Sequence, residues 1–284
     1  MTTVLAHEEL TLGTSTPRLA VDRTMGIVRY LTIDGVRAYH LSYACGTCGI
    51  VLRREPGAPV GALDAEQVRD RLNSGLDHLH PEVVDAFSRQ LPYGPYLVML
   101  MDVQPRLVQP GTADDYFVAE VPGLWAEDEG GGATVAYYRF GERRIDENNQ
   151  LFQFAVPLTD RLDPDTVAHY ATTAGHPTAG DSAAGGPTAA GDPAVGRSAA
   201  VSHAAVGHPA AGRPVVAGRP TAVSLAFLDV EGPWDSRVRH WGLTHYLLDG
   251  HHKMAAGPVR ILTFVAMAES VATDDELRRL PTLL

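Results

Sequence analysis

Residues 247–266 read LLDGHHKMAAGPVRILTFVA, and this stretch says most about the fold. The apolar residues 246–248 predict a short strand, and Asp249-Gly250 predicts a turn after it. Residues 251–256 fit a first turn of helix, which Gly257-Pro258 ends. Residues 259–266 are apolar and rich in β-branched side chains, and they predict a returning strand. The unit is therefore strand, turn, short helix, strand.

The chemistry of this unit lies in residues 249–253, Asp-Gly-His-His-Lys, here named the DGHHK turn. A helix that starts directly after a turn presents free N–H groups and the positive end of its dipole. We expect Gly250, His251, His252 and Lys253 to bind a phosphate or carboxylate, and His251, His252 and Asp249 to be catalytic. The alternative is a capped helix whose histidines only satisfy nearby backbone groups.

The run from 247 to 266 resembles the core motif of the ParB/sulfiredoxin-like superfamily, over roughly residues 244–266. That motif is a strand, then Asp-Gly-His-His-Arg or a variant, then a helix with alanines and a strand. Members bind nucleotide phosphates at the helix start, and include nucleotide-hydrolysing partition proteins, sulfiredoxin and a free-serine kinase. The resemblance implies that Gly250, His251, His252 and Lys253 line a phosphate site for ATP or another nucleotide, with Asp249 holding the turn. Lys253 replaces the usual arginine and loses its bidentate grip on phosphate.

The cysteines Cys45 and Cys48 form a second candidate site, in the sequence YACGTCGIV. A glycine follows each cysteine, as the tight turn of a zinc knuckle requires. Residues 50–52 favour a strand, whereas a helix would follow a thioredoxin-type redox pair. We therefore expect bound zinc in a knuckle-like hairpin, with inert or oxidisable thiols and redox catalysis as alternatives.

Two cysteines supply half of a tetrahedral zinc site, so histidines or carboxylates must complete it. We expect His240 and His245, five residues apart, to be these ligands. Further candidates are His40, His78, His80, His251 and His252. With one histidine, a water position stays open and the zinc is catalytic; with two, the site is structural. The sequence leaves this choice open.

Acidic residues precede the DGHHK turn: Asp229, Glu231 and Asp235 lie around Gly232-Pro233-Trp234. One of these carboxylates can serve as a general base or metal ligand. The alternative is a set of solvated loop carboxylates on an acidic protein.

Composition narrows the class of protein. The sequence has 284 residues, 45% hydrophobic content and a formal net charge of −11. This charge argues against general binding to nucleic acids or anionic membranes. Residues 1–20 do not resemble a signal peptide, no window has the length of a membrane span, and two cysteines cannot staple a secreted domain. We expect a cytoplasmic protein whose partner is a small phosphorylated ligand or nucleotide.

The pattern along the chain predicts an α+β fold, a mixed sheet with short helices. We expect strands at 26–34 and 36–43 with an Asp34-Gly35 turn, and at 50–54, 96–103, 116–121, 134–140, 151–156 and 224–230. Helices are expected around 68–76, from Pro81 and at 165–170, and a last one from Asp274. Residues 171–222 are almost entirely Ala, Gly, Pro, Thr, Ser and Val, which predicts a disordered insertion. The domain prediction is 1–170 with the knuckle, the linker 171–222, and 223–284 packing on the first region.

Three functions are compatible with these features. The first is a nucleotide- or phosphate-binding enzyme, catalysing phosphoryl transfer or nucleotide hydrolysis, with bound zinc. The second is a zinc-dependent hydrolase or lyase that uses Cys45, Cys48 and histidine ligands. The third is a non-catalytic, zinc-stabilised binding protein.

Overall fold

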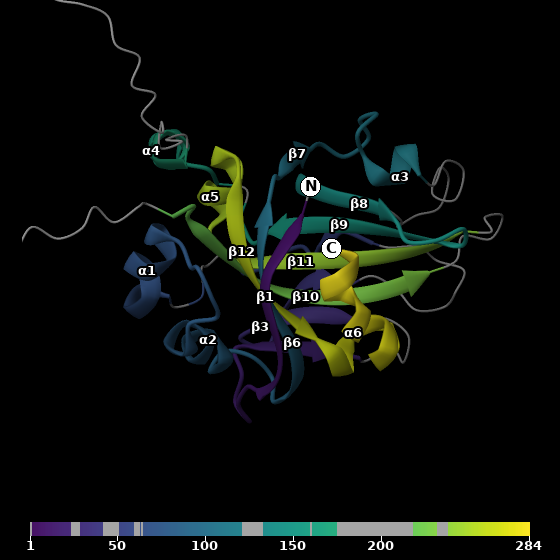
Figure 1. Ribbon diagram of the computed structural model, residues 1–284, viewed down its shortest axis with the longest axis horizontal. Coiled ribbons are helices and arrows are strands. Elements are labelled where there is room, and N and C mark those ends of the chain that lie inside the picture. Colours follow the sequence, from purple (N-terminus) through teal and green to yellow (C-terminus); the bar gives the residue numbers. More distant parts are fainter. Residues whose placement is uncertain are drawn as a thin grey trace, which may run out of the picture.

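The computed structural model describes residues 2–23, 29–41, 51–59, 63, 65–120, 133–159, 161–174, 218–231 and 238–284. An eight-stranded mixed sheet dominates these residues (Figure 1). Its strands, in spatial order, are β1 (Thr3–Leu12), β6 (Gly94–Val103), β12 (Val259–Ala266), β10 (Thr221–Glu231), β11 (Arg239–Asp249), β9 (Asn149–Pro157), β8 (Tyr137–Arg144) and β7 (Arg106–Val108). Neighbours are antiparallel except for β12 with β10 and β11 with β9, which are parallel.

The central strands have both faces buried, which explains their nearly continuous apolar sequences. Successive side chains of a strand point to opposite faces, so the sheet separates two cores. The core on the convex face of the sheet, here named the outer core, includes Phe227, Tyr246 and Phe264. The core on the concave face, here named the inner core, includes Leu228 and Leu243. Each central strand contributes to both.

A second sheet packs against the outer core. Its order is β2 (Leu19–Asp22), β3 (Tyr30–Ile33), β4 (Val36–His40) and β5 (Arg53–Arg54). The predicted hairpin is confirmed: Asp34 and Gly35 turn the chain with φ of +50° and +79°. The hydroxyl group of Tyr39 donates to Pro157 O at 2.8 Å, which connects β4 to the large sheet.

Short helices cover both cores. They are α1 (Arg69–Ser74), α2 (Pro81–Ser88), α3 (Tyr116–Ala119), α4 (Pro164–Ala174), α5 (His251–Ala256) and α6 (Asp274–Leu283), with 3₁₀ turns η1 (Glu66–Val68) and η2 (Met267–Glu269). Pro81 starts α2 as predicted, and α6 starts with a capping box between Thr273 and Glu276. Leu277 and Leu280 place α6 on the inner core.

The large sheet curls until its first strand approaches its seventh. The hydroxyl group of Thr2, next to β1, donates to Phe140 O of β8 at 3.4 Å and accepts from Gln153 Nε2 of β9 at 3.0 Å. The inner core therefore fills the concave face, and α6 lies against it (Figure 1).

One predicted strand, 116–121, is wrong. Residues 116–119 form α3, because the buried carboxylate of Asp115 caps a helix start by accepting from Phe117 N at 3.3 Å. The aromatic and β-branched residues Tyr116, Phe117 and Val118 favour a strand locally, and this cap overrides that preference.

The α+β mixed sheet with short helices is confirmed. Strands from both sides of the predicted linker belong to one sheet, with β10, β11 and β12 between β6 and β9. The linker ends are corrected: residues 171–174 belong to α4, and residues 221 and 222 to β10. Residues 175–217 and the cysteine hairpin lie outside the described residues. No helix in the described ranges combines the length and apolar character that a bilayer crossing requires.

Candidate functional site

The DGHHK turn joins the end of β11 to α5. Gly250 adopts the left-handed conformation, φ +93°, directly before the helix. A Cβ atom at Gly250 would lie 2.7 Å from Ala222 Cβ and 2.8 Å from Ala222 Cα. Glycine is therefore required twice, for its backbone angle and for the close approach of β10.

Lys253 is buried beneath this turn, with 3% of the residue exposed. Its ammonium donates to Thr221 O and to Asp249 Oδ2, both at 3.0 Å, and lies 5.8 Å from the ring centre of Tyr170. Burial lowers the pKa of Lys253, and the Asp249 carboxylate opposes this shift. The side chain predicted to contact a ligand thus ties β10, β11 and α5 together.

The two histidines lie above this ion pair and are half-buried. Their ring centres are 4.0 Å apart. His252 Nε2 accepts from Asp163 N at 2.9 Å, which places the hydrogen of a neutral ring on Nδ1. Burial, followed by the neighbouring His252, lowers the pKa of His251. The imidazole of His251 is therefore neutral at pH 7 and can accept a proton.

Helices α1 and α4 hold this corner of the molecule (Figure 1). Asp163 caps the start of α4: its carboxylate accepts from Thr166 Oγ1 at 2.5 Å and from Asp165 N at 3.2 Å. The hydroxyl group of Tyr170 on α4 donates to Asn73 Oδ1 on α1 at 3.0 Å. The structure thus gathers Asp249, Gly250, His251, His252 and Lys253 at one packed helix junction.

The two histidines predicted to complete a zinc site lie on opposite faces of β11. His240 is on the outer face, where Nδ1 shares a 2.7 Å hydrogen bond with the hydroxyl group of Tyr116. His245 is on the inner face, where Nδ1 lies 3.1 Å from Ser224 Oγ and 3.2 Å from Thr263 Oγ1. Burial lowers the pKa of His240 to about 4 and that of His245 to about 3. The sheet prevents the two imidazoles from binding one ion together.

Cys45 and Cys48 lie outside the described residues. Of the further histidines named for their site, His40 ends β4 and stacks on Tyr30, with ring centres 5.0 Å apart. His78 and His80 lie between α1 and α2, with ring centres 3.7 Å apart.

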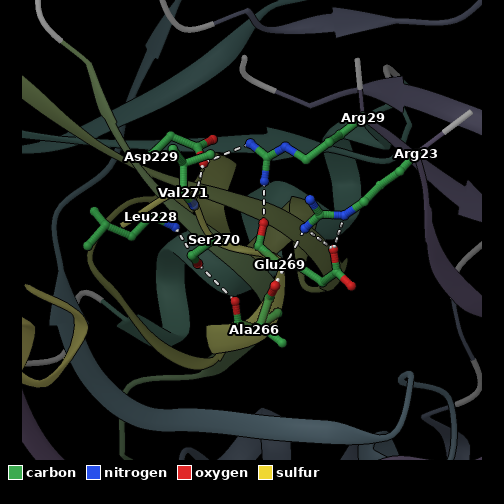
Figure 2. A network of polar contacts seen from close by, with 9 residues as sticks. Arg23, Arg29, Leu228, Asp229, Ala266, Glu269, Ser270 and Val271 are labelled. Atoms are coloured by element: carbon green, nitrogen blue, oxygen red, sulfur yellow. Dashed lines mark hydrogen bonds and ion pairs between the residues drawn. The ribbon is translucent and has the colours of Figure 1, made fainter. Parts of the chain in front are cut away.

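Among the acidic residues before the DGHHK turn, Asp229 is fully buried and structural. Figure 2 shows its carboxylate accepting from Arg29 Nη2 at 2.7 Å and from Val271 N at 3.2 Å. Arg29 Nη1 also donates to Glu269 O, and Arg23 donates to the Glu269 carboxylate at 2.7 Å. Burial raises the pKa of Asp229, and Arg29 opposes this shift. Asp235 is outside the described residues.

Comparison with known proteins finds no relative. No protein-family model, no curated protein and no solved structure matches the chain.

Sequence reasoning missed the residues that support the site. Thr221 falls within the predicted linker, and Asp163 and Tyr170 are distant from the turn along the chain. Only Tyr170, the last aromatic residue before the Ala/Gly/Pro-rich stretch, carried a local signal for a packed element.

Proposed function

We propose that this protein binds a phosphorylated small molecule at the DGHHK turn and catalyses phosphoryl transfer or nucleotide hydrolysis there. One observation carries the proposal: Lys253 and Asp249 hold the turn from beneath, while His251 and His252 lie side by side and part-exposed above it. A role limited to capping does not require a second imidazole packed against the first.

The groups at the turn suit an anion followed by a proton transfer. The first N–H groups of an α-helix have no partners within the helix, and N–H groups at this position can donate to phosphate oxygens. His252, oriented by Asp163 N, can donate through Nδ1. His251 can accept the proton of an attacking hydroxyl group or water as its oxygen bonds to phosphorus and the leaving oxygen departs.

The motif resemblance supports a nucleotide such as ATP as the ligand class. In this proposal Lys253 supports the turn and does not contact the phosphate as the motif's usual arginine would, because its ammonium is already bonded to Thr221 O and Asp249. Zinc at Cys45 and Cys48 belongs to the same proposal as a separate, structural component.

Calorimetric titration of the whole protein with inorganic phosphate, AMP, ADP and ATP tests the proposal. We expect at least one of these anions to bind, and His252→Gln to weaken its binding. In a separate assay of phosphoryl transfer or nucleotide hydrolysis, we expect His251→Gln to lower the turnover rate by about 10²–10⁴-fold, the range for loss of a general base. The melting temperature of this variant should change little. His7→Gln, an exposed histidine on β1, is the matched control. Failure of all four anions to bind at millimolar concentration would contradict the proposal.

A further inference from the structure

Three potential metal ligands converge in the loop between α1 and α2. The ligand atoms of Asp77, His78 and His80 all lie within 4.8 Å of one another. His78 Nδ1 is 2.7 Å and His80 Nε2 is 2.9 Å from the same oxygen, Asp77 Oδ1. Two imidazole nitrogens and a carboxylate oxygen thus already face a common point.

The loop is held at both ends. Leu76 N donates to Thr221 Oγ1 at 2.9 Å, and Leu76 O accepts from Arg260 Nη1. Leu79, between the two histidines, packs on the outer core, and Pro81 begins α2. The three ligands are therefore displayed from an anchored segment, which lowers the conformational entropy lost when they bind an ion.

We propose that Asp77, His78 and His80 form a binding site for a divalent d-block metal ion, with zinc as the physiological class. Imidazole nitrogen with one carboxylate selects zinc, copper, nickel or cobalt over magnesium and calcium, which prefer all-oxygen sites. Three protein ligands leave at least one position for water, as in open zinc sites. The exposed side chains of Asp77 and His78 leave that position accessible from solvent.

Groups behind His80 complete the site. His80 Nδ1 lies 3.0 Å from Arg71 Nη1 and 3.6 Å from Glu82 Oε1, and Arg71 Nε lies 2.9 Å from Glu82 Oε1. With Nε2 bound to a metal, the hydrogen of the neutral ring moves to Nδ1. Arg71 Nη1, which donates to Nδ1 in the metal-free arrangement, then turns away, and Glu82 Oε1 moves from 3.6 Å into hydrogen-bond distance to accept this hydrogen. A carboxylate in this position orients a metal-binding imidazole and raises its basicity.

This site has three ligands of its own, requires neither Cys45 nor Cys48, and does not depend on the proposed function. It also differs from the pairing of His240 and His245, which β11 keeps apart. The hydrogen bond from His80, the largest cause, lowers the pKa of Asp77 to about 2, so the carboxylate is ionised at neutral pH.

Cobalt(II) binding to the full chain provides the test, followed by its d–d absorption and by titration against a competing chelator. The measurement uses the double variant Cys45→Ser/Cys48→Ser, so that only nitrogen and oxygen ligands remain. We expect one equivalent of cobalt without thiolate charge-transfer bands, and displacement of the cobalt by zinc. His78→Ala and Asp77→Asn should each weaken binding by more than 100-fold, and Glu82→Gln by about 10–100-fold. His7→Gln should bind as the parent does.

Two outcomes overturn the proposal. One is loss of all cobalt binding in the cysteine double variant, which would mean that any site depends on the thiolates. The other is unchanged affinity in both His78→Ala and Asp77→Asn, which would place the ion elsewhere. His78 and Asp77 are exposed, so these variants keep the fold, and circular dichroism checks this.

Discussion

Among single residues, Lys253 has a different role in the structure from the ligand contact that its sequence motif predicted. It is the only lysine of the sequence, and its ammonium is inside the molecule between Thr221 O and Asp249. An arginine at this point would have to bury a longer, forked side chain. Lys253 therefore supports the turn from beneath through these two acceptors.

Replacing Lys253 by methionine should destabilise the fold. The stem keeps its packing, but Thr221 O and the Asp249 carboxylate lose their donor, so the free energy of unfolding should fall by about 1.5–3 kcal/mol. Urea denaturation measures this fall. Acylation gives a second readout: the native Lys253 side chain should resist an amine-reactive reagent and react in urea, as mass spectrometry detects. Rapid labelling of the native protein would show that the ammonium is exposed and available to ligands.

Gly250→Ala should be more damaging than alanine at another left-handed glycine. The added Cβ meets Ala222 at 2.7 Å, whereas Gly111, with φ +78°, has nothing within 4 Å of its added Cβ. Gly111→Ala should cost about 1–2 kcal/mol for the backbone angle alone. Gly250→Ala should cost more and weaken anion binding. Equal losses of unfolding free energy for the two variants would show that the backbone near Ala222 moves enough to accommodate the added Cβ atom at little cost.

At the scale of elements, α3 depends on one carboxylate. Asp115 is buried and accepts hydrogen bonds from Phe117 N at 3.3 Å, Gly111 N at 2.7 Å and Tyr137 Oη at 2.7 Å. Asp115→Ala should therefore lower the free energy of unfolding by at least about 2 kcal/mol. Asp114→Ala is the control, since its side chain forms an exposed ion pair with Arg106. That change should cost below about 1 kcal/mol by chemical denaturation. Similar costs for both would contradict the role of the cap.

Local sequence predicts some of these elements well and others poorly, for physical reasons. The strand at 259–266 can be predicted because burial of both its faces requires a continuous apolar run. The helix start at 274 can be predicted because its capping box is a local sequence pattern. The helix at 116 is not, because its cap and the packing of Tyr116 outweigh the strand preference of its residues. The separation of His240 and His245 could have been predicted, since five residues in a strand place two side chains on opposite faces.

Local sequence patterns do not predict contacts between residues that are far apart along the chain. The partner of Asp229 is Arg29, 200 positions away, and the acceptor of Lys253 is Thr221, within a stretch of low complexity. The position of β10 to β12 between β6 and β9 likewise depends on pairings that no local pattern specifies. The DGHHK turn was predictable as a turn before a helix, but the burial of its lysine was not.

For the molecule as a whole, the burial of His240 and His245, one in each core, should make the free energy of unfolding depend on pH. Their folded pKa values, about 4 and about 3, lie below the unfolded value of about 6.5. The unfolded chain therefore binds more protons as the pH falls below 6.5, and stability is lost in that direction. Each histidine should remove about 2 kcal/mol from the free energy of unfolding between pH 7.5 and 5.

Urea denaturation at pH 7.5, 6.5, 5.5 and 5.0 measures this dependence. His240→Gln should reduce the slope of unfolding free energy against pH, because a neutral amide can still bond to Tyr116 and does not titrate. A variant with wild-type slope would show that His240 titrates alike in both states and is not held neutral by burial. The same measurement on His7→Gln, an exposed position, gives the baseline. Because the two imidazoles lie on opposite faces of one strand, the losses from the two cores should add, and a double variant should show the smallest slope.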